Sequence, residues 1–260
     1  MWPPTGVIGM VHLPPLPGSP RWAGPPGDFE PVLERAASDA RTLADGGVDA
    51  VLVENYGDAP FHRDRVEAVT IAAMTRAVAA VREAVDRPVG VNVLRNDARA
   101  ALAVAAATGA TFIRVNVHTG GMYTDQGWIE GRAAETLRLR SAIAPGVAIL
   151  ADVLVKHATP PAGLTLADAA RDAWHRGLAD ALVVSGPATG APTEPDRVAA
   201  VREAVPGAVV LVGSGVTAAT VAAALSAADG VIVGSALEAD GVAGGPVELD
   251  RVRRLVRAAR

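Results

Sequence analysis

The sequence predicts a (β/α)8 barrel, and three observations favour this fold class. Eight short apolar runs recur along the 260-residue chain, and most of them are rich in valine and isoleucine. Each run is apolar at nearly every position, which is typical of strands buried on both faces of a parallel sheet. A helical stretch follows each run, and barrels of this kind use about 200–250 residues as one domain. We therefore expect residues 1–260 to form one barrel domain, with an open doubly wound sheet as the alternative.

The expected elements alternate strictly along the chain. The expected strands are Val7–Met10, Ala50–Val53, Val89–Val93, Phe112–Val117, Ala148–Val153, Ala181–Val184, Val209–Val212 and Val231–Val233. The expected helices are rich in alanine, arginine and glutamate, and they are Phe29–Asp45, Asp64–Ala84, Asp97–Thr108, Gly131–Ile143, Thr165–Arg176, Glu194–Val205, Thr217–Ala227 and Asp250–Ala259.

The helix boundaries carry recognisable signals. Asp97, Thr165 and Thr217 are expected N-caps, because short polar side chains accept hydrogen bonds from the first helical N–H groups. The glycines Gly46-Gly47, Gly109 and Gly177 are expected to end helices in the left-handed conformation. Other helices stop at "DRP", "APG" or "VPG", where proline cannot continue a helix.

The composition excludes several classes of protein. The chain is 50% apolar and 20% charged, its net charge is −4, and it contains no cysteine. We therefore expect no nucleic-acid surface, and there can be no disulfide, thiolate nucleophile or zinc–sulfur site. The alanine-rich run 217–237 is interrupted by polar residues, so we expect no membrane insertion. The first ten residues lack a basic head and a long apolar run, so we expect no secretory signal and a cytoplasmic location.

Polar side chains gather where the expected strands end, which is where barrel enzymes place their chemistry. We expect five of them to be catalytic, as acids, bases or oxyanion stabilisers: His12, Glu54, His118, Asp152 and Lys156. A carboxylate closing an apolar strand is costly to bury without a partner or a ligand. Lys156 is the only lysine in the chain and could act as a base, a phosphate partner or a Schiff-base amine. Each of these residues could instead be a structural hydrogen-bonding or solvated side chain.

Four further strand-end residues are expected to bind substrate: Asn92, Asn116, His157 and Ser185. The two asparagines could equally satisfy backbone groups of the barrel. Arg95-Asn96 follows the third strand, and we assign it no role.

The last two strands end in the same pattern, "LVGSGV" and "IVGSAL". Glycine lets an anion approach the backbone, serine adds a hydroxyl donor, and a following helix N-terminus adds oriented N–H groups. Because the loops after strands 7 and 8 form the usual phosphate site of such barrels, we expect phosphate at Gly213, Ser214, Gly215, Gly234 and Ser235. The alternative is a tight turn without a ligand. The glycine-rich "VVSGPATGAP" could cover the same ligand.

Two other features leave alternatives open. His12, Glu54 and Asp152 could converge on a divalent metal, but no HxH or HExxH spacing supports this, so we predict no metal and no cofactor. The segment "HTGGMYTDQGWIEG" combines glycines with Tyr123 and Trp128. It could be a lid that excludes water, or a folded surface excursion that packs its own aromatic rings.

Several long motifs, in order, resemble the BtpA family, also called the BtpA/SgcQ family. They are "GMVHLPPLPGSP", "ENYGDAPF", "GVNVLRND", "FIRVNVHTG", "ADVLVKHATP", "VVSGPATGAPT" and "LVGSGV" with "IVGSALEADG". The resemblance implies a TIM barrel of the ribulose-phosphate-binding type. A cyanobacterial member is linked to the biogenesis of photosystem I, and other members occur near sugar-phosphate genes in non-photosynthetic organisms. The family's motif residues fall on His12, Glu54, Asn92, Asn116, His118, Asp152, Lys156, His157, Ser185, Ser214 and Ser235.

Two functions remain in competition. The first is an enzyme that acts on a small phosphorylated metabolite, a sugar phosphate or nucleotide-like compound, by acid–base chemistry as an isomerase, epimerase or lyase. Phosphate-ester hydrolysis is less favoured without a metal cluster. The second is a non-catalytic assembly or stability factor for a protein complex, as the resemblance suggests. The sequence leaves the oligomeric state open; because barrels often dimerise, a homo-oligomer is one alternative.

Overall fold

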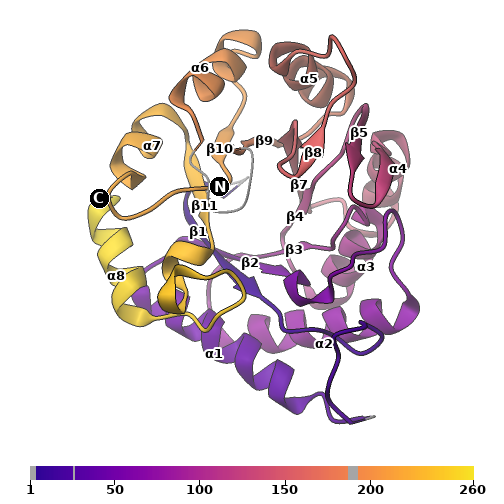
Figure 1. The fold of residues 1–260 in the computed structure, drawn as a ribbon, viewed down its shortest axis with the longest axis vertical. Helices are drawn as coiled ribbons and strands as arrows, with labels where there is room; N and C mark the ends of the chain where they lie inside the picture. The colour runs from indigo at the N-terminus through magenta and orange to yellow at the C-terminus, as the bar shows by residue number, and fades with distance from the viewer. Residues whose placement is uncertain (1–3, 26, 187–192) are drawn as a thin grey trace.

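Eight parallel strands close into a barrel in a computed structural model that describes residues 4–25, 27–186 and 193–260. Neighbouring strands follow the order β1-β11-β10-β9-β7-β4-β3-β2, so the sheet closes on itself (Figure 1). The barrel strands are β1 Gly6–His12, β2 Ala50–Glu54, β3 Val89–Asn92, β4 Phe112–Val115, β7 Ala148–Val153, β9 Ala181–Val184, β10 Val210–Val212 and β11 Gly230–Val233.

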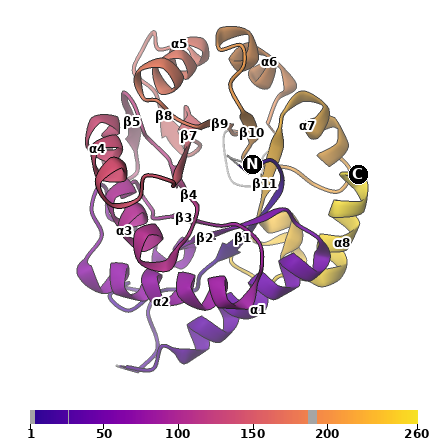
Figure 2. The ribbon, with the colours of Figure 1, turned by 180° about the vertical axis from the view of Figure 1, so that it is seen from behind.

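Helices surround this barrel on its outer side, as both views of the ribbon show (Figures 1 and 2). They are α1 Glu30–Gly46, α2 Ala68–Ala84, α3 Ala98–Thr108, α4 Ala133–Ile143, α5 Leu166–Arg171, α6 Pro195–Ala204, α7 Val221–Ala227 and α8 Leu249–Ala258. A π-helical stretch, η2 Asp172–Arg176, continues α5, and the short 3₁₀ turns are η1 Tyr56–Asp58, η3 Ser235–Leu237 and η4 Ala239–Gly241. The predicted (β/α)8 barrel is confirmed, and the open doubly wound alternative is wrong.

The inner faces of the strands explain how one end of the barrel becomes polar. Side chains alternate between the two faces of a strand with a period of two. Residues of one buried cluster fill the barrel interior: Ile8, Met10, Ala50, Leu52, Phe112, Ala148, Leu150, Ala181, Val183, Leu211 and Ile232. The inward-facing positions that follow, toward the carboxyl ends of the strands, hold polar or small residues: His12, Glu54, Asn92, Arg114, Asn116, Asp152, Ser185, Gly213 and Gly234. The residues of this buried cluster therefore form an apolar plug inside the barrel, and a polar layer covers the plug at the carboxyl ends of the strands.

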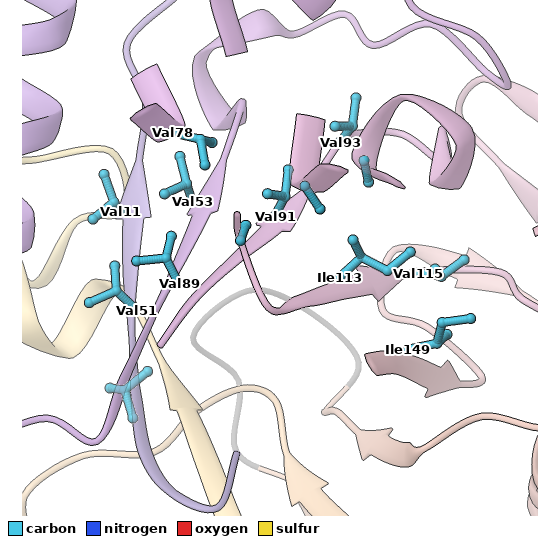
Figure 3. Packing of buried hydrophobic residues seen from close by; sticks show 14 of the residues in the cluster. Val11, Val51, Val53, Val78, Val89, Val91, Val93, Ile113, Val115 and Ile149 are labelled. Atoms are coloured by element: carbon cyan, nitrogen blue, oxygen red, sulfur yellow. The ribbon is translucent and has the colours of Figure 1, made fainter. Parts of the chain in front are cut away.

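The outward faces of the same strands form a second and larger core against the helices. Alternate residues such as Val51, Val53, Val89 and Val91 point outward and pack beneath helix residues such as Val78 (Figure 3). Burying both faces of each strand accounts for the nearly continuous apolar runs in the sequence.

The segment "HTGGMYTDQGWIEG", for which the sequence leaves two alternatives open, forms a folded excursion. After β4 the chain forms an antiparallel hairpin of β5 Gly121–Thr124 and β6 Gly127–Glu130, and β5 also pairs with β8 Ala158–Thr159. The Tyr123 and Trp128 rings pack on each other with centroids 4.7 Å apart. The structure thus favours the second alternative, an excursion that packs its own aromatic rings.

Some helix boundaries differ from the prediction. Asp97 and Thr165 are side-chain N-caps as expected, but α7 begins only at Val221. Thr217 is not its N-cap, because a local turn, in which the Thr217 N–H donates to Thr220 Oγ1, precedes the helix. The expected left-handed Gly177 is also wrong: its φ is −80°, and Leu178 takes the left-handed conformation instead. Glycine is needed at 177 because a Cβ would lie 2.7 Å from the Ala173 carbonyl oxygen.

In the part of the chain that the structure describes, no helix combines the length and the apolar character needed to cross a bilayer.

Candidate active site

A cavity of about 250 Å³ lies at the carboxyl ends of the barrel strands. Ten of the residues that the sequence predicts for the site line it: His12, Glu54, Asn116, Lys156, His157, Gly213, Ser214, Gly215, Gly234 and Ser235. They come from distant parts of the chain and meet because parallel strands end at one rim of the barrel. Residues without a predicted role also line the cavity, among them Arg21, Tyr56, Arg95 and Arg114.

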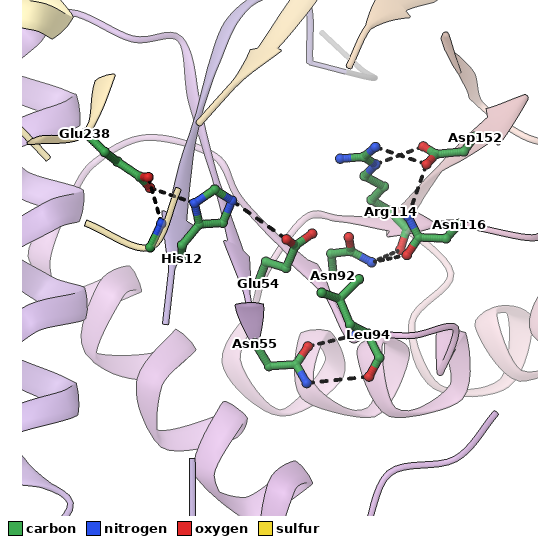
Figure 4. Close-up of polar contacts among 10 residues, drawn as sticks. His12, Glu54, Asn55, Asn92, Leu94, Arg114, Asn116, Asp152 and Glu238 are labelled. Atoms are coloured by element: carbon green, nitrogen blue, oxygen red, sulfur yellow. Dashed lines mark hydrogen bonds and ion pairs between the residues drawn. The ribbon is translucent and has the colours of Figure 1, made fainter. Parts of the chain in front are cut away.

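His12 is held between two carboxylates. Its Nδ1 lies 2.6 Å from Glu238 Oε1, and its Nε2 lies 3.7 Å from Glu54 Oε1 (Figure 4). Because an ionised carboxylate only accepts hydrogen bonds, His12 donates to Glu238 through Nδ1–H. Nε2 therefore faces Glu54, which also lines the cavity. This is the arrangement in which a buried carboxylate orients a histidine for proton transfer.

Glu238 was not predicted from the sequence, although it completes this arrangement. It lies in the segment after β11, is only 1% exposed, and accepts a second hydrogen bond from the Gly244 N–H at 2.8 Å. The Tyr56 ring covers His12 from another side, with ring centroids 4.5 Å apart. Burial, followed by the charge of Glu54, raises the pKa of the Tyr56 phenol, so this group is a protonated donor near neutral pH.

A hydrogen-bonded network forms the floor of the cavity. Arg114 donates to both carboxylate oxygens of Asp152, through Nε at 2.8 Å and Nη2 at 3.0 Å. Asn116 donates to Asp152 at 3.1 Å and accepts from Asn92 at 3.2 Å (Figure 4). Burial opposes the positive charge of Arg114, but Asp152 outweighs this effect and raises the pKa of the guanidinium. The guanidinium therefore keeps its charge in the interior, in a bidentate pair with Asp152.

Asp152 was predicted to be a catalytic residue, but in the structure it lies behind the residues that line the cavity. Its carboxylate is fully engaged and reaches the cavity only through Arg114 and Asn116. Asn92 likewise lies behind Asn116, and it also donates to the Arg114 carbonyl oxygen.

The three residues that could have converged on a metal do not form a set of ligands. Asp152 is already bound to Arg114 through both carboxylate oxygens, so it does not join His12 and Glu54. The described residues contain no cluster of three or more histidines or carboxylates placed to hold a metal.

Lys156 is positioned by a constrained backbone. Leu154 and His157 adopt φ values of 51° and 56°, a left-handed conformation that is unfavourable for residues with a Cβ. The Lys156 carbonyl oxygen accepts a hydrogen bond from Arg95 at 2.8 Å, and β8, which starts at Ala158, is paired to the hairpin. Burial lowers the pKa of the Lys156 amine, and the nearby Arg114 lowers it further.

The two glycine–serine loops lie side by side in the cavity wall. Gly234 is required because a Cβ there would lie 2.6 Å from His12 Cε1. Gly213 is required because a Cβ would lie 2.5 Å from a Val183 methyl group. The two loops lead into different elements: η3 starts directly at Ser235, whereas α7 starts six residues after Gly215. The expected helix N-terminus after the first loop is therefore absent from that position, because the Thr217–Thr220 turn intervenes.

Besides Asp152 and Asn92, two further predicted residues, His118 and Ser185, do not line the cavity. His118 donates through Nε2 to the Gly177 carbonyl oxygen at 2.8 Å, at the end of η2, and burial lowers the pKa of its imidazole. Ser185 is buried beside Gly213, and its Oγ has no hydrogen-bond partner among the described residues. Most of the glycine-rich segment after Ser185, residues 187–192, lies outside the described residues.

The closed parallel barrel, with its polar cavity at the carboxyl rim, defines a TIM-barrel protein. The chain belongs to the BtpA family, whose model matches residues 4–260. It is 48% identical over 252 residues to the photosystem I biogenesis protein BtpA of Synechocystis sp., covering 97% of this chain and 87% of that protein. It is 34% identical over 251 residues to the putative sgc region protein SgcQ of Escherichia coli, covering 96% of this chain and 92% of that protein.

Solved structures share the fold at low sequence identity. A thiamine phosphate pyrophosphorylase from Pyrococcus furiosus aligns with a TM-score of 0.60 and 15% identity, covering 98% of this chain and 95% of that one. A phosphoribosyl anthranilate isomerase from Thermus thermophilus aligns with a TM-score of 0.57 and 13% identity, covering 97% of each chain. These similarities confirm the barrel fold.

Proposed function

We propose that this protein is an enzyme that acts on a small phosphorylated metabolite by acid–base chemistry, as an isomerase, epimerase or lyase. The observation that carries this proposal is the charge of the cavity. Arg21, Arg95, Arg114 and Lys156 line it, whereas Glu54 is the only carboxylate among the described lining residues. An excess of positive charge in a concave, partly desolvated site favours an anionic ligand.

The phosphate would bind at the two glycine–serine loops. Ser214 and Ser235 both line the cavity, and a barrel commonly holds phosphate at its last two loops. Thiamine phosphate pyrophosphorylase and phosphoribosyl anthranilate isomerase share this fold, and each is named for a phosphorylated compound. A ligand phosphate bound there would place the rest of a small molecule over His12 and Glu54.

His12 and Glu54 are the proposed acid–base pair. Glu54 is 7% exposed at the cavity wall, and its Oε1 lies 3.7 Å from His12 Nε2. Its carboxylate can therefore accept a proton from a bound substrate, while Glu238 keeps His12 oriented. Lys156 and Arg114 would stabilise the negative charge that develops when that proton leaves. The enzyme would work in the cytoplasm.

Ligand-dependent thermal stability tests this proposal. The full chain is melted with inorganic phosphate, sugar phosphates and nucleotides, and a true ligand at about a hundredfold excess over its Kd adds about 2.7 kcal/mol of stability. Ser214→Asp and Ser235→Asp introduce a negative charge beside the phosphate and should abolish the shift. Ser226→Asp, on the exposed side of α7, is the matched control and should keep it. If no phosphorylated compound raises the Tm, the proposal is wrong.

One observation favours a second candidate, an assembly factor for a protein complex. The relative with 48% identity is named for photosystem I biogenesis. Glu54→Gln separates the two functions, because it removes the proposed base without changing the surface of the molecule. An assembly function that survives Glu54→Gln, together with recovery of a stoichiometric complex, would favour the second candidate.

A further inference from the structure

Lys156 is an amine that lines the cavity without an ion pair. None of the carboxylates in the described residues lies within 4.0 Å of its ammonium group, although Glu54 and Asp152 are near enough to influence its charge. Asp152 is already bound to Arg114 through both oxygens. The ammonium form of this half-buried lysine is therefore supported by carboxylates only at a distance.

The surroundings of Lys156 lower the pKa of its amine. Removal from water disfavours the ammonium form, and the guanidinium of Arg114 disfavours it further, while the charges of Glu54 and Asp152 oppose this shift only in part. A lysine that is desolvated and placed beside another cation becomes a nucleophile near neutral pH. The left-handed residues Leu154 and His157 on either side, and the bond from Arg95 to the Lys156 carbonyl oxygen, fix the backbone that carries this side chain.

We propose that Lys156 forms a Schiff base with the carbonyl carbon of a phosphorylated aldehyde or ketone. This inference rests on the proposed function and narrows its substrate class to phosphorylated carbonyl compounds. The phosphate would bind at Ser214 and Ser235, while the carbonyl would lie at Lys156, since both groups line one cavity of about 250 Å³.

The covalent step balances as a condensation. The Nζ lone pair of Lys156 attacks the carbonyl carbon, and the carbonyl oxygen takes up a proton to give a carbinolamine. Nitrogen loses one proton, the hydroxyl group takes up one and leaves as water, and a protonated imine remains. Overall, one carbonyl compound, one neutral amine and one proton give one iminium ion and one water. The iminium then withdraws electrons from the adjacent carbon, from which Glu54 can remove a proton.

Borohydride trapping on the full chain tests this proposal directly. The probes are dihydroxyacetone phosphate, glyceraldehyde 3-phosphate and pyridoxal 5′-phosphate, each followed by sodium borohydride, with intact mass and peptide mapping as the readout. The sequence contains one lysine, so the other primary amine of the purified chain is the α-amine at its N-terminus, which serves as an internal reference. We expect at least one probe to label Lys156 at least tenfold faster than the α-amine, and to do so only after reduction.

Two controls separate the amine from the charge and from the phosphate site. Lys156→Arg keeps a cation in the cavity but removes the nucleophile, so it should lose the adduct while glycerol 3-phosphate still raises the Tm. Dihydroxyacetone and pyridoxal, which lack phosphate, should label Lys156 more slowly than their phosphorylated forms.

The outcomes also distinguish this inference from the proposed function. Labelling of Lys156 no faster than of the α-amine, with all three probes, overturns the Schiff base. If glycerol 3-phosphate raises the Tm in the same samples, the proposed phosphate-binding enzyme stands and only its covalent step is wrong. If glycerol 3-phosphate has no effect either, both proposals fail.

Discussion

At the scale of single residues, the site depends on pairs that lie far apart in the sequence. His12 and Glu238 are separated by 226 positions, yet their side chains lie 2.6 Å apart. Arg114 and Asp152 are separated by 38 positions and form a bidentate pair that is almost fully buried. In both pairs one member is oriented by a partner set further from the cavity. The groups that face a ligand are therefore held by contacts that the ligand does not make.

Asp152→Asn tests the energetic importance of the buried pair. The substitution removes the negative charge and leaves the Arg114 guanidinium unpaired in the interior, so we expect a loss of about 3–5 kcal/mol in the free energy of unfolding. Glu135→Gln is the matched control, because its partner Arg132 is exposed, and it should cost at most about 1 kcal/mol. Urea unfolding of both variants measures the difference. Equal losses in the two variants would contradict this assignment.

At the scale of the elements, the register of the strands determines both how the barrel interior packs and where along the barrel axis the polar residues of the site lie. The register pairs His12 with Glu54 and Glu54 with Asn92, so these three polar residues lie at one level around the rim. Directly below them, the Phe112 ring fills the interior and lies against Gly90. The absence of a side chain at Gly90 therefore makes room for the largest residue of the plug.

Gly90→Ala tests this packing. A Cβ at position 90 would lie 2.2 Å from the Phe112 ring, and overpacking of this kind typically costs about 1–3 kcal/mol. Gly146→Ala is the control, because a Cβ there meets nothing within 4 Å, and it should leave the stability unchanged or slightly raised. Phe112→Leu should partly rescue Gly90→Ala. A Gly90→Ala variant as stable as the parent protein would show that the plug can rearrange.

At the scale of the whole molecule, His118 makes stability depend on pH. Its Nε2–H donates to the Gly177 carbonyl oxygen, and its buried Nδ1 has no partner among the described residues. Burial is the main cause of its lowered pKa, so between that value and the ordinary value of 6.5 the unfolded chain binds more protons than the folded chain. The free energy of unfolding should therefore fall as the pH drops below about 6.5. Above that pH, His118 is neutral in both states and should not change the stability.

His118→Asn tests this dependence. Asparagine can still donate to Gly177 but does not titrate, so its loss of Tm between pH 7 and pH 5 should be smaller than that of the parent protein. Thermal melts of both proteins at matched ionic strength measure the difference. Parallel curves for the two proteins would rule out His118 as a source of the acid sensitivity.

Local patterns in the sequence predicted much of this protein. The apolar runs, the helix caps at Asp97 and Thr165, and the repeated Gly-Ser ends depend on neighbouring residues, so they can be interpreted without a structure. Arg114 carries a local signal of the same kind, because it continues the inward-facing period from Phe112 to Asn116. A charge at an inward-facing position of a buried strand needs a partner inside the barrel, which marks Arg114 as a residue of the site.

Other features of the site were decided only by the tertiary structure. Glu238 lies in the quoted motif "IVGSALEADG", but its segment has no regular hydrophobic period that would show where the side chain points, and only folding brings it to His12. His118 follows β4, but its ring packs against Gly177 and does not line the cavity. The physical reason is that local sequence specifies where a strand ends and which face a residue takes. The direction of a side chain beyond the strand end depends on the partner that satisfies its polar atoms, and that partner is supplied by distant parts of the chain.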